Sequence, residues 1–115
     1  MSRAGEIKAA VFDVDGTLYD YKNGCVPDSA IEAIGKLKEK GYLIIVATGR
    51  TMAMLNSQIT ETLAPDYYIL SNGALVSDRN NLLIFSRPFS RTETELLVNL
   101  TETYGGAMIL KYQNE

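Results

Sequence analysis

Three short apolar runs, separated by amphipathic patterns, constrain the fold of this 115-residue chain more than any other feature. The runs are Ile7–Val14, Tyr42–Ala47 and Tyr67–Leu70, and all are rich in β-branched, aliphatic or aromatic residues. Short runs of this kind are typical of strands that are buried on both faces. The alternating order of strands and helices predicts parallel strands joined by right-handed crossovers, which is the doubly wound α/β fold class.

Capping and turn residues indicate where the intervening helices begin and end. Ser29-x-x-Glu32 has the pattern of a capping box, and Gly41 can close the helix that follows it. A second helix is expected to follow the second apolar run and to end near Leu63, because Pro65 cannot continue it. The chain between the first run and the first helix is expected to be a loop that contains glycine, asparagine and proline.

The second half of the chain predicts a hairpin, a helix and a strand. Residues 74–76 and 82–86 are expected to pair around a polar loop. Ser90-x-x-Glu93 is another capping-box pattern, and the helix that it begins is expected to end at a Gly-Gly pair. Residues 107–112 are then expected to form a last strand.

Composition excludes several kinds of chemistry and of partner. The chain has no histidine, so it cannot carry a Ser-His-Asp triad, a Cys-His pair or a histidine-ligated zinc ion. The single cysteine, Cys25, cannot form an internal disulfide, and we therefore expect a cytoplasmic protein. A net charge of −3 without a basic stripe argues against a nucleic-acid partner. No apolar run approaches the ~20 residues that cross a membrane, so no membrane partner is expected.

Polar residues follow each of the three apolar runs. Asp13 and Asp15 end the first run, residues 48–50 follow the second, and Ser71 and Asn72 follow the third. Because ligands in this fold class bind beyond the carboxyl ends of the strands, we expect the three clusters to converge. Two neighbouring carboxylates repel each other unless a cation neutralises them. Mg²⁺ suits a site that combines few carboxylates with a substrate phosphate.

The other polar residues fit a phosphate ligand, although each also has an ordinary structural explanation. Gly16 allows a sharp turn that exposes backbone N–H groups, and Thr48 and Gly49 can begin a helix whose N-terminus faces an anion. Arg50 can hold an oxyanion by two bonds. Alone, an aspartate at a strand end is a common turn former, Thr-Gly is a common helix cap, an arginine is usually a surface residue, and Asn72 with the next glycine is a common turn.

Three segments together resemble the haloacid dehalogenase superfamily, in its Cof-type (IIB) phosphatase branch. Phe-Asp-Val-Asp-Gly-Thr-Leu at residues 12–18 resembles the first motif, and Ala-Thr-Gly-Arg at residues 47–50 resembles the second. Ser-Asn-Gly-Ala at residues 71–74, followed by a hairpin, is similar to the third core strand of that branch. The resemblance implies part of a Rossmann-like core at residues 1–86 and the beginning of an inserted α/β cap domain at residues 87–115.

The resemblance also implies a role for each matching residue. Asp13 would be the nucleophile that forms an aspartyl-phosphate, and Asp15 would be the general acid/base. The Asp13 carboxylate and the Asp15 backbone carbonyl would hold Mg²⁺, so both residues belong to the implied metal site. Thr48 would bind the transferring phosphoryl group. The other implied phosphate- or substrate-binding residues are Gly16, Thr17, Gly49, Arg50 and Asn72. The implied activity is hydrolysis of small phosphorylated metabolites such as sugar phosphates.

Two motifs of the family, a core lysine and a later acidic cluster, have no counterpart here. Lys111 is the only lysine after Lys40, and it lies in the expected cap, so it is not assigned to that motif. We therefore expect the front portion of a longer enzyme, which can be inactive alone. The alternative is a module that binds Mg²⁺ and phosphate and needs a partner or the missing part. A receiver-type signalling domain is disfavoured, because its phosphoacceptor aspartate would replace Ser71 or Asn72. The residues leave the substrate and the oligomeric state open.

Overall fold

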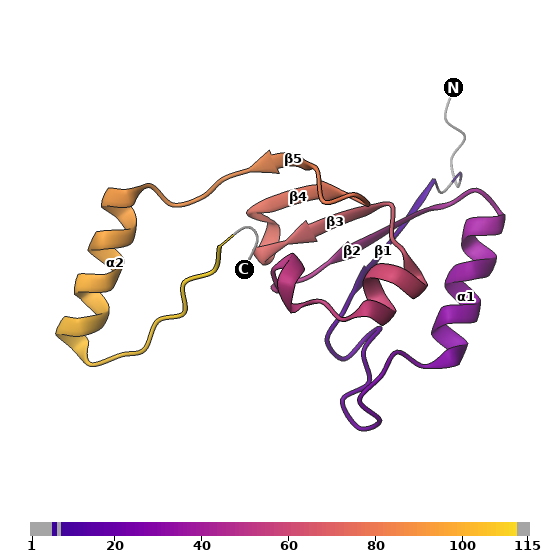
Figure 1. The fold of residues 1–115 in the computed structure, drawn as a ribbon, viewed down its shortest axis with the longest axis horizontal. Helices are drawn as coiled ribbons and strands as arrows, with labels where there is room; N and C mark the ends of the chain where they lie inside the picture. Colours follow the sequence, from indigo (N-terminus) through magenta and orange to yellow (C-terminus); the bar gives the residue numbers. More distant parts are fainter. Residues whose placement is uncertain (1–5, 7, 113–115) are drawn as a thin grey trace.

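A five-stranded mixed sheet organises the chain (Figure 1). The structure is a computed structural model that describes Glu6 and residues 8–112. The strands, in sheet order, are β1 (Ala9–Asp13), β2 (Leu43–Ala47), β3 (Tyr67–Leu70), β4 (Leu75–Asp78) and β5 (Leu83–Ser86). Strands β1 to β3 are parallel, and the hairpin of β4 and β5 is antiparallel. The predicted α/β fold with a parallel core and a hairpin is confirmed, although Ile7, the predicted start of the first strand, lies outside the described residues.

Helical segments connect the strands and follow the hairpin. They are α1 (Asp28–Glu39), the short 3₁₀ segments η1 (Met52–Met54) and η3 (Ser71–Gly73), the π-helical segment η2 (Gln58–Leu63), and α2 (Arg91–Tyr104). Helix α1 contacts both β2 and η2, so α1 and η2 lie on the same face of the sheet. That arrangement leaves the core on one side of the sheet.

Alternation along the strands decides which residues form the core. Ile44 and Val46 of β2 and Tyr68 and Leu70 of β3 point toward α1 and η2 and are almost completely buried. The other face carries apolar residues that the described chain does not cover, including Val11, which is 57% exposed. One face of the sheet is therefore packed, and the other is an uncovered apolar surface.

The helix starts differ from the sequence prediction at two places. Helix α1 has Pro27 as its N-cap and no side-chain cap, so the predicted Ser29 capping box is wrong. The fixed φ of proline suits a helix start, and the Pro27 carbonyl accepts the N–H groups of Ala30 and Ile31 at 3.0 and 3.2 Å. The predicted continuous second helix is also wrong, because Leu55 is extended and a new helical turn begins where Asn56 Oδ1 accepts the Ile59 N–H at 3.1 Å.

The region after the hairpin forms a helix that stands away from the sheet (Figure 1). The predicted capping box of α2 is confirmed: Ser90 accepts the Glu93 N–H at 3.1 Å, and the Glu93 carboxylate accepts the Ser90 N–H at 2.8 Å. The predicted strand at residues 107–112 is wrong, because this segment pairs with no strand that the structure describes. A radius of gyration of 17.1 Å reflects the separation of α2 from the core, since a chain of this length is expected near ~13 Å when compact.

Candidate active site

The carboxyl ends of the three parallel strands bring the predicted polar clusters to one edge of the sheet. Asp13, the last residue of β1, lies opposite Ala47 of β2, which in turn lies opposite Ile69 of β3. Beyond this register, the Thr48 N–H donates to the Ile69 carbonyl at 2.9 Å, and the Asn72 N–H donates to the Thr48 carbonyl at 3.2 Å. The convergence expected from the sequence is therefore present in the backbone.

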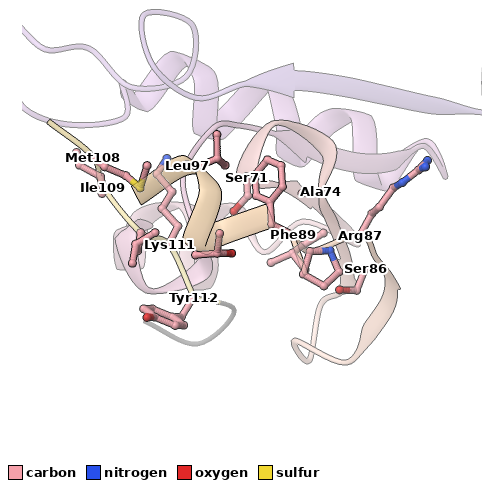
Figure 2. A pocket seen from close by; sticks show the side chains of 14 residues that line it. Ser71, Ala74, Ser86, Arg87, Phe89, Leu97, Met108, Ile109, Lys111 and Tyr112 are labelled. Atoms are coloured by element: carbon pink, nitrogen blue, oxygen red, sulfur yellow. The ribbon is translucent and has the colours of Figure 1, made fainter. Parts of the chain in front are cut away.

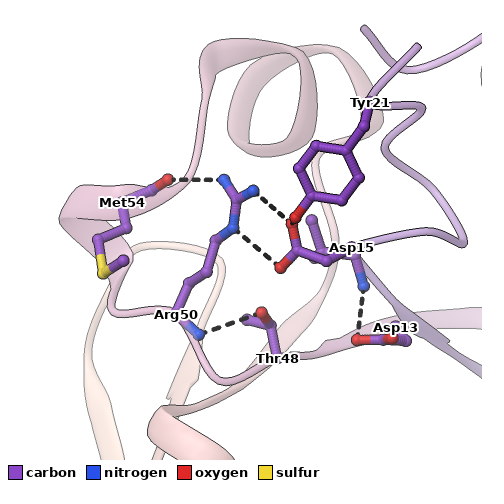
Figure 3. Close-up of polar contacts among 7 residues, drawn as sticks. Asp13, Asp15, Tyr21, Thr48, Arg50 and Met54 are labelled. Atoms are coloured by element: carbon purple, nitrogen blue, oxygen red, sulfur yellow. Dashed lines mark hydrogen bonds and ion pairs between the residues drawn. The ribbon is translucent and has the colours of Figure 1, made fainter. Parts of the chain in front are cut away.

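An ion pair between Asp15 and Arg50 is the central contact of this edge (Figure 3). Arg50 Nε donates to Asp15 Oδ2 at 3.0 Å, and Arg50 Nη2 donates to Asp15 Oδ1. Hydrogen bonding to Arg50, followed by that to Tyr21, holds the pKa of Asp15 below its usual value, and the same pair raises the pKa of Arg50. Arg50, expected to hold an oxyanion by two bonds, thus holds the expected general acid/base instead.

Two tyrosines contact this ion pair, and neither was predicted from the sequence as a site residue. The Tyr21 hydroxyl donates to Asp15 Oδ1, and this bond raises the pKa of Tyr21. Tyr19 lies under the Arg50 guanidinium, with 5.5 Å from Cζ to the ring centroid. The signal that could have found them is their position, because Tyr19 directly follows the first motif and Tyr21 comes two residues later in the loop that leads away from Asp15.

Asp13 remains accessible at the same edge. Its side chain is exposed, and its Oδ1 accepts the N–H of Val14 at 2.9 Å (Figure 3). Its other oxygen accepts no hydrogen bond from the residues that the structure describes. Asp13 therefore has a free carboxylate oxygen for a cation or for attack on an electrophile.

The turn after Asp15 differs in one respect from the expectation. Gly16 has a φ of 78°, which favours glycine, so the sharp turn is present. However, the Gly16 N–H donates to the Tyr19 carbonyl at 3.1 Å and the Thr17 N–H to the Val14 carbonyl at 3.2 Å. These two N–H groups are bonded within the turn and are not exposed as expected, while the phosphate-binding role of Gly16 and Thr17 stays a prediction; the Thr17 side chain is exposed.

The second motif forms a tight loop and not the start of a long helix. The first helical segment after it is η1, which has three residues, so the expected helix N-terminus at Thr48 and Gly49 is absent. The Thr48 hydroxyl accepts the Arg50 N–H at 3.1 Å and keeps its own hydrogen for donation. A Cβ on Gly49 would lie 2.8 Å from Asn72 Oδ1, so a larger residue there would displace the exposed Asn72 side chain. Asn72 itself has a φ of 57°, and its side chain is exposed.

The end of the described chain returns to this loop. Lys111 Nζ donates to the Gly49 carbonyl at 2.6 Å, a contact across 62 residues that sequence reasoning did not predict. Lys111 also lines a cavity of about 520 Å³ between the hairpin, α2 and the returning segment (Figure 2). Most of its other walls are apolar, including Phe89 and Leu97.

At this edge of the described sheet, the donors that could hold a divalent cation are the Asp13 carboxylate and the Asp15 backbone carbonyl. No group of three or more His, Cys, Asp or Glu side chains gathers around a common point among residues 6 and 8–112. Both oxygens of the Asp15 carboxylate accept hydrogen bonds from Arg50 or Tyr21, so this side chain is not available to a metal in this arrangement. The Asp13 carboxylate is exposed and only partly bonded, which suits a hard cation.

Comparison with known protein families shows which family this chain belongs to. Residues 10–115 match the haloacid dehalogenase-like hydrolase family. The chain belongs to this family. The family predicted from residues 12–18, 47–50 and 71–74 is thus confirmed.

Relatives of known structure or name place the chain near phosphatases of this family. It resembles the solved structure of the subclass IIB sugar phosphatase BT4131, with a TM-score of 0.74 and 33% identity over 85% of this chain and 38% of that one. The phosphatase BT1666 from Bacteroides thetaiotaomicron gives a TM-score of 0.79 and 26% identity over 91% of this chain and 39% of that one. The 5-amino-6-(5-phospho-D-ribitylamino)uracil phosphatase YcsE of Bacillus subtilis is 31% identical to this chain. The match covers 69% of this chain and 31% of the length of YcsE.

The chain is much shorter than these proteins. It spans between 18% and 34% of the length of the curated relatives that it matches. Within the part that the structure describes, no helix is long and apolar enough to cross a membrane.

Proposed function

We propose that this chain carries the phosphate-handling part of a Mg²⁺-dependent hydrolase of small phosphorylated metabolites. The observation that carries the proposal is the meeting of Asp13, the Asp15–Arg50 pair and Thr48 at the ends of parallel strands. The family match and the resemblance to a protein named as a sugar phosphatase support a phosphomonoester, such as a sugar phosphate, as substrate. The division into a core at residues 1–86 and a cap at residues 87–115 belongs to this proposal, as does a cytoplasmic location.

The first step forms an aspartyl-phosphate. A carboxylate oxygen of Asp13 attacks phosphorus, the bond from phosphorus to the leaving oxygen breaks, and Asp15 donates a proton to that oxygen. Thr48 donates its hydroxyl hydrogen to a phosphoryl oxygen. Because the bond to Arg50 favours the charged form of Asp15, we propose that Arg50 turns toward the anionic substrate before Asp15 acts as an acid.

The second step regenerates the carboxylate. Asp15 takes a proton from water, the water oxygen attacks phosphorus, and the bond between phosphorus and Asp13 breaks to release phosphate. The Asp13 carboxylate and the Asp15 backbone carbonyl would hold Mg²⁺, and the metal supplies positive charge beside the phosphoryl oxygens when bound. Among the remaining positions, Gly16, Thr17, Gly49 and Asn72 would shape the loops around the phosphate.

A phosphatase assay on the 115-residue chain tests the proposal. The substrates are p-nitrophenyl phosphate and a hexose 6-phosphate, each with Mg²⁺ and with excess chelator. We expect turnover that chelation abolishes and that Asp13→Asn lowers at least about a thousandfold. Asp28→Asn is the matched control, since Asp28 is exposed in the first turn of α1. Activity that survives Asp13→Asn would contradict the nucleophile assignment.

A second candidate function is a Mg²⁺- and phosphate-binding module that needs further chain or a partner for turnover. The observation that favours it is the free edge of β1, the first strand of the sheet, beside the uncovered apolar face that includes Val11. This candidate predicts Asp13-dependent binding of beryllofluoride with Mg²⁺ but no turnover by the chain alone. Turnover that requires Mg²⁺ would contradict it, and the absence of both binding and turnover would contradict both candidates.

A further inference from the structure

The loop that follows Asp15 closes on itself before α1 begins. The Asp20 N–H donates to the Cys25 carbonyl at 2.9 Å, and the Asp20 carbonyl accepts the Gly24 N–H at 2.7 Å. The Asp20 carboxylate also accepts the Lys22 N–H at 2.9 Å. These bonds form a small, internally bonded loop at residues 20–25, so a side chain that projects from it has a fixed support.

Tyr21 projects from this loop and contacts Asp15 (Figure 3). Its hydroxyl donates to Asp15 Oδ1, the oxygen that also accepts from Arg50 Nη2, while Oδ2 accepts from Arg50 Nε at 3.0 Å. Both carboxylate oxygens therefore have donors, which come from the loop at residues 20–25 and from the second motif. A carboxylate held from two directions has one favoured orientation.

Tyr21 contributes little to the core. It is 66% exposed, and its ring meets Tyr19 edge-on, with 5.4 Å between centroids and 77° between planes. Tyr19 in turn lies under the Arg50 guanidinium. Tyr19 therefore packs against both Arg50 and Tyr21, and the hydroxyl of Tyr21 lies beside the Asp15 carboxylate and the Arg50 guanidinium.

We propose that Tyr21 is a positioning residue for Asp15, an inference that rests on the proposed phosphatase function. When Arg50 turns toward an anionic substrate, the Tyr21 hydroxyl remains as the donor that keeps the Asp15 carboxyl directed at the leaving oxygen. Tyr21 acts through Asp15 and does not touch the substrate. The loop at residues 20–25 is therefore part of the catalytic support, although it carries none of the family motifs.

Tyr21→Phe tests this role, because it removes one hydroxyl from an exposed side chain. The readout is the first-turnover release of alcohol from an alkyl phosphate and of p-nitrophenol from p-nitrophenyl phosphate. An alkoxide needs a proton to leave and p-nitrophenolate does not, so loss of a positioned acid affects the alkyl phosphate more. We expect a roughly tenfold slower release for the alkyl phosphate, unchanged KM, and a smaller effect on the aryl phosphate.

Tyr104→Phe is the matched control, since Tyr104 is 83% exposed on α2, away from the sheet. It should leave both rates unchanged. Equal losses on both substrates with Tyr21→Phe, or a loss confined to KM, would overturn the proposal, because either result indicates a general structural role.

A second measurement does not depend on turnover. In a chain labelled with ¹³C-aspartate, Tyr21→Phe should shift the Cγ resonance of Asp15, and Tyr104→Phe should not. An unmoved Asp15 resonance contradicts this inference, whereas a wild-type chain that hydrolyses neither phosphate contradicts the proposed function. The two measurements therefore distinguish an error in the role of Tyr21 from an error in the proposed function.

Discussion

Residues 8–80 and residues 81–112 contain equally clear local signals, but only the first region is packed. Every side chain that is buried in the described chain belongs to residues 8–80, and none belongs to residues 81–112. Helix α2 has a complete capping box and a glycine C-cap, whereas α1 has no side-chain cap. Local signals therefore suffice to begin and end a helix, but burial against the sheet determines where a helix lies.

The largest expected difference between the two regions is in amide hydrogen exchange. Strand β2 is the central strand of the parallel sheet, and its Ile44 N–H donates to Asp66 Oδ2 at 2.8 Å, whereas the N–H groups of α2 are held only within a helix that has few contacts with the sheet. We expect the amides of Ile44 and Val46 to exchange at least about a thousandfold more slowly than those at the centre of α2. Exchange measured by NMR checks this, and α2 amides as slow as Ile44 would show that the comparison is wrong.

The next difference is in the cost of removing an aliphatic side chain. Ile44 is completely buried, and Leu97 of α2 is 37% exposed. We expect Ile44→Ala to lower the free energy of unfolding by about 3 kcal/mol, because it leaves a cavity, and Leu97→Ala to lower it by less than about 0.5 kcal/mol. Urea unfolding of the two variants measures both. Similar losses would mean that Leu97 is packed in solution.

The same contrast explains which parts of the fold could be predicted from the sequence. The strand runs, the hairpin and the α2 capping box depend on local pattern, and all were predicted. The strand predicted at residues 107–112 is absent from the structure. A strand needs a neighbouring strand to pair with, and the local sequence pattern does not show whether such a neighbour exists. The prediction of a continuous second helix was wrong for a local reason. Asn56 lies in the middle of the helical pattern, and its side chain caps a new helical turn there.

The candidate site divides in a similar way. Convergence of Asp13, Asp15 and Thr48 follows from topology, because parallel strands bring their carboxyl ends together, and this could be predicted. The partner of Arg50 could not be predicted. An arginine that can bind a phosphate can equally bind a carboxylate that lies 35 residues away in the sequence. The Tyr21 contact was missed because its one signal is its position shortly after the first motif, and an exposed loop tyrosine at that position has no pattern that names its partner.

A pH-dependent difference comes from the buried face of the sheet. Burial of Tyr68 raises its pKa above the usual value near 10, with a smaller opposing effect from Arg79. The neutral phenol is therefore favoured in the folded state, so its contribution to stability is fully present below pH 10 and is lost as the pH rises above it. Tyr68→Phe should flatten the alkaline loss of stability measured by urea unfolding between pH 8 and about 11. Tyr104→Phe should not, because the Tyr104 phenol meets water in both states.

The smallest expected effect is at the only hydrogen bond that joins residues 107–112 to the core within the described chain. Lys111 Nζ donates to the Gly49 carbonyl, but both side chain and segment are exposed, so Lys111→Met should change the free energy of unfolding by less than about 0.5 kcal/mol. Its effect should be local: the ¹³C resonance of the Gly49 carbonyl shifts, and order parameters fall along residues 107–112. Lys40→Met, at the end of α1, is the control that should do neither. If Lys111→Met leaves the Gly49 resonance unmoved, the segment does not contact the loop at residues 48–50 in solution, and the separation between the two regions is complete.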